Sequence, residues 1–374
     1  MSSEDSLFRP IFVPDELREA VSARAWLQAM LDAERALAAA SGVDGVAEAC
    51  DASLYDLAAI AEEARGPGNP VEPLVRALRE RSGGADAHRG ATSQDVLDTA
   101  AMLVARNARA LVIRELEAAA DGCARMAEQH RATVMPARTL LQQAVPTTFG
   151  LKSAGWLVAL LDARQTLLAW TPVAELGGAA GTLALLGDRG LDVLAAFARE
   201  LGLAEPELPW HASRRPVHEL VAACDGVASA CTKIGLDLVL LAQTEVAEIR
   251  VRDGVSSTMP HKRNPVAAVL ARACALRVHA LAGTFVGEHE HERAAGAWHA
   301  EWEALSDVLA LTGGAAFHVS RALDGLEVDV ERMRENLRVE TVSEAGRDVA
   351  PEEYLGAAAA FVERALARFR ADVG

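Results

Sequence analysis

The chain has 374 residues, a net charge of −16 and only 4% aromatic residues. This length is sufficient for two or three domains with a large buried core. The acidic balance, without any lysine- or arginine-rich block, argues against nucleic acid as a partner, because a negative surface repels phosphate backbones. Alanine and leucine dominate the apolar residues, which favours helix over sheet.

The beginning of the chain and its cysteines indicate a cytoplasmic protein. The opening MSSEDSLFRPIFVP lacks the basic region and apolar run of a signal peptide. No stretch approaches the roughly 18 apolar residues of a membrane span, so we expect no membrane association. The cysteines lie at no zinc-binding spacing, and no carboxylate cluster has ligand spacing, so we expect reduced thiols, no metal and no cofactor. The five cysteines are Cys50, Cys123, Cys224, Cys231 and Cys274.

In chain order, the sequence first predicts shorter helices. Residues 15–41 form an apolar helical pattern with Pro14 near its start and Gly42 as its stop. A second helical stretch near 52–65 ends in the turn-rich GPGNP.

Three long helices follow. The pattern from about 95 to 130 contains no proline, and Thr92 with Asp95 fits a capping box at its start. Residues 151–170 and 216–250 predict two more, the latter spanning about 50 Å. Helices this long need partners for their apolar stripes, so we expect a bundle. Pro265 can open a further helix after Asn264, and the segment beyond 335 predicts a short terminal helical piece.

Three polar segments interrupt these helices and suggest a shared site. In GVSSTMPHKRNP (254–265), Lys262 and backbone N–H groups could stabilise a serine alkoxide, and the ammonium could hold a substrate carboxylate. In HRGATSQD (88–95), Thr92 and Ser93 could cradle a carboxylate at a helix N-terminus, although ordinary capping explains them equally well. The segment ARTLLQQAVPTTFG (137–150) is weak by itself.

Together these segments resemble the conserved regions of the fumarase/aspartase superfamily. SSTMPHKRNP is similar to its G-S-S-x-M-P-x-K-x-N signature, and GATSQDVLDTA and RTLLQQAVPTTFG resemble its other two regions, in the same order. The segments LGGAAGTLALLGDRG, LPWHASR, LLAQTEVAEI and ERAAGAWHAEW most resemble the bacterial 3-carboxy-cis,cis-muconate cycloisomerase branch.

The resemblance implies an all-α, fumarase/aspartase-like chain in three parts. These are an N-terminal helical domain (1–93), a central long-helix bundle (94–335) and a shortened C-terminal helical segment (336–374). It further implies a homotetramer with active sites shared between subunits, acting on a small di- or tricarboxylate.

The resemblance also assigns roles by position. Ser256 matches the base on the mobile loop, and Lys262 and Asn264 match residues that grip the substrate carboxylate. The remaining positions match substrate contacts, to which we add His88 because it adjoins the Thr-Ser pair. These substrate-binding candidates are His88, Thr92, Ser93, Thr139, Gln142 and Arg214.

Two departures from the family pattern bear on the chemistry. Val255 replaces the glycine of the signature, which restricts the loop. Leu140 stands where several relatives have a histidine of the acid–base apparatus. An amine or hydroxide leaves only with an acid's help, whereas a carboxylate, with a pKa near 4, leaves unaided. Leu140 therefore favours a reaction that expels a stable anion.

The expected function is that of a 3-carboxy-cis,cis-muconate cycloisomerase in aromatic catabolism. A nitrosuccinate-type lyase, whose nitrite also leaves unaided, and an adenylosuccinate-lyase-like enzyme are alternatives. A non-catalytic, crystallin-like scaffold is disfavoured by the presence of Ser256, Lys262 and Asn264.

Overall fold

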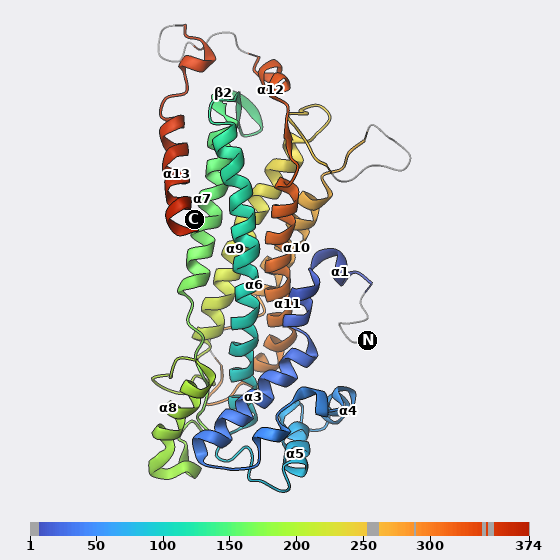
Figure 1. Ribbon diagram of the computed structural model, residues 1–374, viewed down its shortest axis with the longest axis vertical. Helices are drawn as coiled ribbons and strands as arrows, with labels where there is room; N and C mark the ends of the chain where they lie inside the picture. Colours follow the sequence, from blue (N-terminus) through green and yellow to red (C-terminus); the bar gives the residue numbers. More distant parts are fainter. Residues whose placement is uncertain (1–6, 253–261, 288, 339–341, 343–347, 374) are drawn as a thin grey trace. The chain divides into compact units, whose positions relative to one another are not determined.

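The protein is predominantly helical. The computed structural model describes residues 7–252, 262–287, 289–338, 342 and 348–373. Over this part of the chain it contains thirteen α-helices and two two-stranded sheets (Figure 1). The all-α fold class expected from the composition is confirmed.

The elements follow in chain order. The first are α1 (Arg9–Phe12), α2 (Asp15–Ala20), α3 (Ala23–Ser41), α4 (Leu57–Glu63), α5 (Val71–Arg81), α6 (Ser93–Gln129), β1 (Val134–Thr139), β2 (Gln142–Thr148) and α7 (Phe149–Ala169). They are followed by α8 (Gly190–Leu201), α9 (Arg215–Leu241), β3 (Ile249–Arg250), α10 (Val266–Ala282), α11 (Ala297–Leu323), β4 (Glu327–Val328), α12 (Val330–Asn336) and α13 (Ala358–Asp372).

The chain divides into two compact units, each assembled from three separate segments. The first unit contains 1–111, 168–222 and 280–310, and the second contains 112–167, 223–279 and 311–374. This division follows contacts in space, and the division along the chain into 1–93, 94–335 and 336–374 remains a prediction.

In the first unit, the helix predicted over 15–41 is interrupted. Ser22 is extended, with φ −68° and ψ 160°, and its side chain caps α3 by accepting from Ala25 N at 3.2 Å. A serine that caps a new helix therefore separates α2 from α3. Gly42, at φ 72°, ends α3 in the left-handed conformation, as predicted. Helix α3 packs against α8, which buries Leu31 and Phe197 among others.

The second unit is built from lengths of long helix that lie side by side (Figure 1). A Cβ atom added at Gly122 of α6 would lie 3.0 Å from Leu323 Cβ of α11. One added at Gly235 of α9 would lie 2.9 Å from the Ala268 carbonyl of α10. These glycines therefore allow close approach between neighbouring helices. Within α7, Trp156 donates to Asp237 Oδ2 of α9 at 2.8 Å.

Two further elements differ from their predicted form. The segment read as a polar break contains the antiparallel hairpin β1–β2, in which Thr139 pairs with Gln142. The two turn residues, Leu140 and Leu141, have positive φ angles of 51° and 63°. Helix α9 ends at Leu241, nine residues before the predicted end, and the chain then turns through Ala247 at φ 51° into β3.

The predicted C-terminal helical piece is present as α13, which buries Val362, Ala365 and Leu366. Across the ranges that the structure describes, no helix is both long enough and apolar enough to cross a membrane.

Candidate active site

The predicted site residues are divided between the two units. His88, Thr92, Ser93 and Arg214 lie in the first, and Thr139, Gln142, Lys262 and Asn264 lie in the second. Ser256, the predicted base, lies outside the described residues, as do Val255 and His261. We therefore describe the surroundings of each group within its own unit.

At the start of α6, the predicted capping interaction forms. The backbone N–H of Thr92 donates to Asp95 Oδ2 at 2.8 Å, and Ser93 is the first residue of the helix. The hydroxyl of Thr92 accepts from Arg293 Nη1 at 2.8 Å. Arg293 thus brings a guanidinium to the predicted carboxylate cradle, a contribution that the sequence analysis missed.

Asp95 also anchors the glycine-rich segment that follows α7. Its Oδ1 accepts from Gly177 N at 2.9 Å, and its Oδ2 accepts from Gly178 N at 3.0 Å. His211 Nε2 lies 2.6 Å from Oδ1. Asp95 is therefore a structural acceptor that joins two parts of the first unit to the start of α6.

Asp95, Glu175 and His211 are all buried, and their ligand-type atoms lie within 4.8 Å of one another, a spacing that could hold a metal ion. Both oxygens of Asp95 already accept hydrogen bonds, however, and Glu175 Oε2 accepts from Trp210 N at 2.6 Å. Burial raises the pKa of the Glu175 carboxyl well above its usual range, and the negative charges of Asp95 and Asp98 add to this. We interpret the cluster as a hydrogen-bonded network, and the absence of a metal remains a prediction.

His88 lies in the loop before α6 in an unusual backbone conformation, with φ 65°. Its Nδ1 lies 2.6 Å from Glu34 Oε1 of α3, and its side chain is 16% exposed. It lines a cleft of about 430 Å³, which we call the His88 cleft. The residues that line this cleft are Glu72, Val75, Arg76, Arg79, Glu80, His88 and Ser93. His88 and Ser93 thus line the same cleft.

Arg214 has different surroundings from those expected of a substrate contact. It is buried, with Nη1 donating to Asp98 Oδ2 at 2.6 Å and Nη2 to Glu301 Oε2 at 2.5 Å. Burial alone would lower the pKa of the guanidinium, but the two carboxylates raise it above its usual value. A substrate carboxylate could bind here only by replacing one of these partners, so the structure gives Arg214 a structural role.

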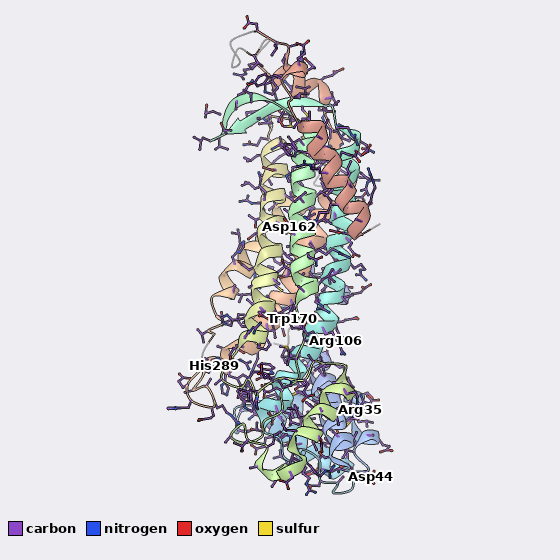
Figure 2. All side chains as sticks on the ribbon, turned by 90° about the vertical axis from the view of Figure 1, so that its left-hand side faces the viewer. Arg35, Asp44, Arg106, Asp162, Trp170 and His289 are labelled. Atoms are coloured by element: carbon purple, nitrogen blue, oxygen red, sulfur yellow. The ribbon has the colours of Figure 1, made fainter. Side chains whose placement is uncertain are left out.

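The surroundings of Arg214 also include His289 (Figure 2), whose side chain is buried and whose Nε2 lies 3.4 Å from Glu301 Oε1. Burial lowers the pKa of His289, and the positive charge of Arg214 lowers it further. Trp298 Nε1 donates to Asp98 Oδ1 at 2.9 Å. The cluster therefore satisfies the buried charges internally, as buried ion pairs require.

In the second unit, Lys262 and Asn264 line a cleft of about 790 Å³, which we call the Lys262 cleft. Its lining carries three cationic side chains, Arg250, Lys262 and Arg263, and one acidic side chain, Glu327. Arg250 is paired with Asp329 at 2.9 Å. The charge balance of this cleft suits an anionic ligand. The full lining is Val239, Ala242, Gln243, Thr244, Ala247, Ile249, Arg250, Val251, Lys262, Arg263, Asn264, Pro265 and Glu327.

Thr139 and Gln142 are exposed at the end of the β1–β2 hairpin and are absent from the lining of the Lys262 cleft. The hairpin is fixed by Arg138, which makes a bidentate contact with the buried Glu248, at 2.9 Å to Oε2 and 2.5 Å to Oε1. Asn336 Nδ2 of α12 donates to the same Oε1 at 2.9 Å. Glu248 thus connects the second motif region to the segment that leads into the third.

Sequence reasoning missed Glu34 and Glu248. A signal for Glu34 was present, because the surrounding residues Leu27, Met30, Leu31 and Leu37 form the buried stripe of α3 and Glu34 lies on the same face. A carboxylate on an apolar face needs a buried partner. Glu248 gives no such signal, since its position depends on where α9 ends.

Comparisons with known proteins agree with this description. A family model described as "Lyase" matches residues 6–280. The chain is 44% identical to a nitrosuccinate lyase from Streptomyces davaonensis, over 89% of this chain and 77% of the relative. It is also 44% identical to a 3-carboxy-cis,cis-muconate cycloisomerase from Bradyrhizobium diazoefficiens, over 88% of this chain and 79% of the relative.

A solved structure is similar over almost the whole chain. The 3-carboxy-cis,cis-muconate lactonizing enzyme from Pseudomonas putida superposes with a TM-score of 0.90 at 35% identity, covering 98% of this chain and all of the other. The family match extends over most of the sequence, and the similar structure shares the helical architecture. The chain therefore belongs to the lyase family of the fumarase/aspartase superfamily.

Proposed function

We propose that this enzyme is a 3-carboxy-cis,cis-muconate cycloisomerase, which interconverts that tricarboxylate with 4-carboxymuconolactone. The observation that carries the proposal is the Lys262 cleft, where Lys262 and Asn264 line a predominantly cationic cavity directly after the serine loop. Its support is the 44% identity to a relative of that name.

In the lactone-opening direction, the Ser256 alkoxide takes a proton from the carbon next to a carboxylate and becomes the hydroxyl. The electrons of the broken C–H bond move into that carboxylate, which becomes a doubly charged aci-carboxylate. Lys262 and Asn264 stabilise this species by charge and by hydrogen bonding, which lowers the barrier to its formation. The neighbouring C–O bond then breaks, and the ring carboxylate leaves with the electron pair as the double bond forms. Lactonisation is the reverse, with the Ser256 hydroxyl returning the proton.

The position of Leu140 supports a leaving group that needs no acid. Its side chain is 96% exposed at the hairpin turn and has no proton to give. A departing carboxylate is the conjugate base of an acid with a pKa near 4 and is stable at neutral pH. The proposed substrate therefore suits a chain with leucine at this position.

The assembly and location belong to the same proposal. We infer a homotetramer whose active sites combine motif regions from different subunits, with His88, Thr92, Ser93, Thr139 and Gln142 contacting a small di- or tricarboxylate. Leu140 and Leu141 are exposed at the tip of the hairpin, and exposed apolar side chains of this kind often mark a contact with another subunit. This exposure supports the proposed assembly. Five buried cysteines that form no disulfide support a reducing, cytoplasmic location.

A second candidate is a nitrosuccinate lyase, favoured by the 44% identity to a relative of that name over 366 residues. Nitrite also leaves unaided, so the leaving-group argument does not separate the two reactions.

A substrate panel separates them. Purified enzyme is incubated with 3-carboxy-cis,cis-muconate and with nitrosuccinate, and the ultraviolet absorption of the conjugated acid and the release of nitrite are followed. We expect turnover of the carboxymuconate and little release of nitrite. Turnover of nitrosuccinate alone would reject the cycloisomerase in favour of the lyase.

A further inference from the structure

We propose that Glu34 is a positioning residue that orients the ring of His88 so that Nε2 faces the substrate in the His88 cleft. The proposal rests on the proposed function insofar as it assigns a carboxylate substrate to that cleft. It adds a residue from α3, outside the three motif regions, to the active-site machinery.

The first step is the buried hydrogen bond. Glu34 is fully buried on α3, and its Oε1 lies 2.6 Å from His88 Nδ1. An ionised carboxylate can only accept a hydrogen bond, so His88 Nδ1 must carry the proton in this contact. The contact therefore fixes both the orientation of the ring and the nitrogen that faces away from α3.

The second step is the backbone of the loop. His88 has φ 65°, a conformation that costs a residue other than glycine energy and persists only where the surroundings impose it. Arg79 of α5 supports the loop from the other side, since its Nε and Nη2 donate to the Ala87 carbonyl at 3.1 and 2.7 Å. The loop is thus fixed at the adjacent residues Ala87 and His88. These contacts hold His88 in its unfavourable backbone conformation and so set the direction of its side chain.

The third step is the free edge of the ring. Among the described residues, His88 Nε2 has no hydrogen-bond partner, and the side chain lines the cleft together with Ser93, Arg76 and Arg79. A substrate carboxylate selects the imidazolium, because only then does Nε2 carry a hydrogen to donate, and ionised Glu34 accommodates that form. Glu72 and Glu80 are the acidic groups lining the cleft.

The unpartnered oxygen of Glu34 fits this role. Its Oε2 is buried with no hydrogen-bond partner among the described residues. An under-satisfied buried carboxylate costs folding free energy, and a charged partner on its other oxygen is the compensation available. The cost of burying the Glu34 carboxylate is therefore lowest when the ring of His88 is positively charged. This is also the form of the ring that can donate from Nε2 to a substrate carboxylate.

A double-mutant cycle tests the proposal. Glu34→Gln keeps the shape but removes the negative charge that accommodates the imidazolium, so the substrate carboxylate loses a charged hydrogen-bond donor. His88→Asn keeps a nitrogen near the Nδ1 position and removes Nε2. We expect each variant to raise KM for 3-carboxy-cis,cis-muconate by about 10- to 100-fold, with kcat within about threefold of wild type, as for lost ground-state binding. The double variant should be no worse than His88→Asn.

Asp32→Asn is the matched control, because it removes a charge from the same helix, where Asp32 contacts Gln28 and Arg35 and does not line the His88 cleft. It should behave as wild type. If Glu34→Gln matches this control, or if the two site substitutions multiply in the double variant, Glu34 does not act through His88. Should Glu34→Gln fail to fold, Glu34→Asp, which keeps the charge but shortens the reach, replaces it in the same cycle with the same criteria.

A second measurement separates this proposal from the proposed function. Calorimetry with tricarballylate, a stable tricarboxylate, gives dissociation constants for the same four proteins. If wild type binds this probe but turns over no carboxymuconate, the proposed function is rejected. The double-mutant cycle, measured as dissociation constants for the probe, then still tests the role of Glu34. If wild type binds neither compound, the carboxylate site itself is rejected.

Discussion

At the residue scale, a serine hydroxyl becomes a base only where its alkoxide is stabilised. The Lys262 cleft has the cationic character for this, with Lys262 and Asn264 in the short segment that precedes α10. The ammonium has two tasks in the proposed reaction, stabilising the alkoxide and the aci-carboxylate, which are both negative and form in sequence. Lys262 therefore stabilises both the base that accepts the proton and the anion that forms when the proton is removed.

Replacing the base should remove turnover without removing the fold. We expect Ser256→Ala to lower kcat by roughly 10²–10⁴-fold, the usual contribution of a positioned acid–base group. The measurement is steady-state kinetics with the preferred substrate of the panel, with size-exclusion chromatography to confirm an unchanged assembly. Ser257→Ala is the control for loss of a neighbouring hydroxyl. Wild-type activity in Ser256→Ala would reject this serine as the base.

The leaving-group argument makes a prediction about Leu140. The side chain is 96% exposed at a turn with φ 51°, so a histidine fits there and tolerates that backbone better than leucine. We expect Leu140→His to change kcat by less than about threefold, whereas an acid supplies roughly 10²–10⁴-fold where the leaving group needs a proton. Kinetics in the lactone-opening direction provide the measurement. A gain of that size would contradict expulsion of a free carboxylate.

At the element scale, the sequence predicted helices far better than the connections between them. The continuous pattern from 95 to 130 reappears as α6 because it contains no proline and Gly122 is its one glycine. The β1–β2 hairpin was missed because its turn is Leu140–Leu141, where residues with positive φ are usually asparagine or glycine. The hairpin is also held by the ion pair of Arg138 with Glu248, a contact between distant segments that no local pattern reveals.

The same contact predicts how the hairpin is held. Glu248→Ala would remove the carboxylate that accepts hydrogen bonds from the guanidinium of Arg138. It would also remove one acceptor of the Asn336 side chain. Since water can solvate the exposed guanidinium that remains, we expect the loss in the free energy of unfolding to be that of hydrogen bonds to a charged group, about 1.5–3 kcal/mol. Urea denaturation followed by circular dichroism measures it. Glu327→Ala, an exposed glutamate in β4, is the control and should change stability little.

At the scale of the whole molecule, the sequence predicted three polar regions as a shared site, but it could not predict the partners of their side chains in the folded chain. Arg214 was read as a substrate contact, yet it is enclosed by Asp98 and Glu301. The sequence could not show this, because Asp98 lies on a helix 116 residues away and its carboxylate meets Arg214 only in the folded chain. A sequence motif shows which segment of the chain contributes to a site. The contacts that form in the folded chain then determine which side chains of that segment can still bind a ligand.

Burial also makes the stability of the molecule depend on pH through Glu175. Burial and the charges of Asp95 and Asp98 raise the pKa of this carboxyl well above its usual range, so the native state keeps a proton that the unfolded chain releases above about pH 4.3. The stabilisation from protonated Glu175 is therefore complete below that pH and is lost as the pH rises toward the folded-state pKa. Glu175→Gln keeps the neutral form at every pH.

The free energy of unfolding of Glu175→Gln, relative to wild type, should thus increase between about pH 5 and pH 8. Urea denaturation at a series of pH values measures this difference. For Glu207→Gln, at an exposed position, the difference in the free energy of unfolding from wild type should not change with pH. The opposite slope would mean that native Glu175 is ionised and that His211 is its charged partner. Since the two nitrogen–oxygen contacts of His211 differ, at 2.6 Å to Asp95 and 3.4 Å to Glu175, the shorter contact already favours Asp95 as the ionised member of the pair.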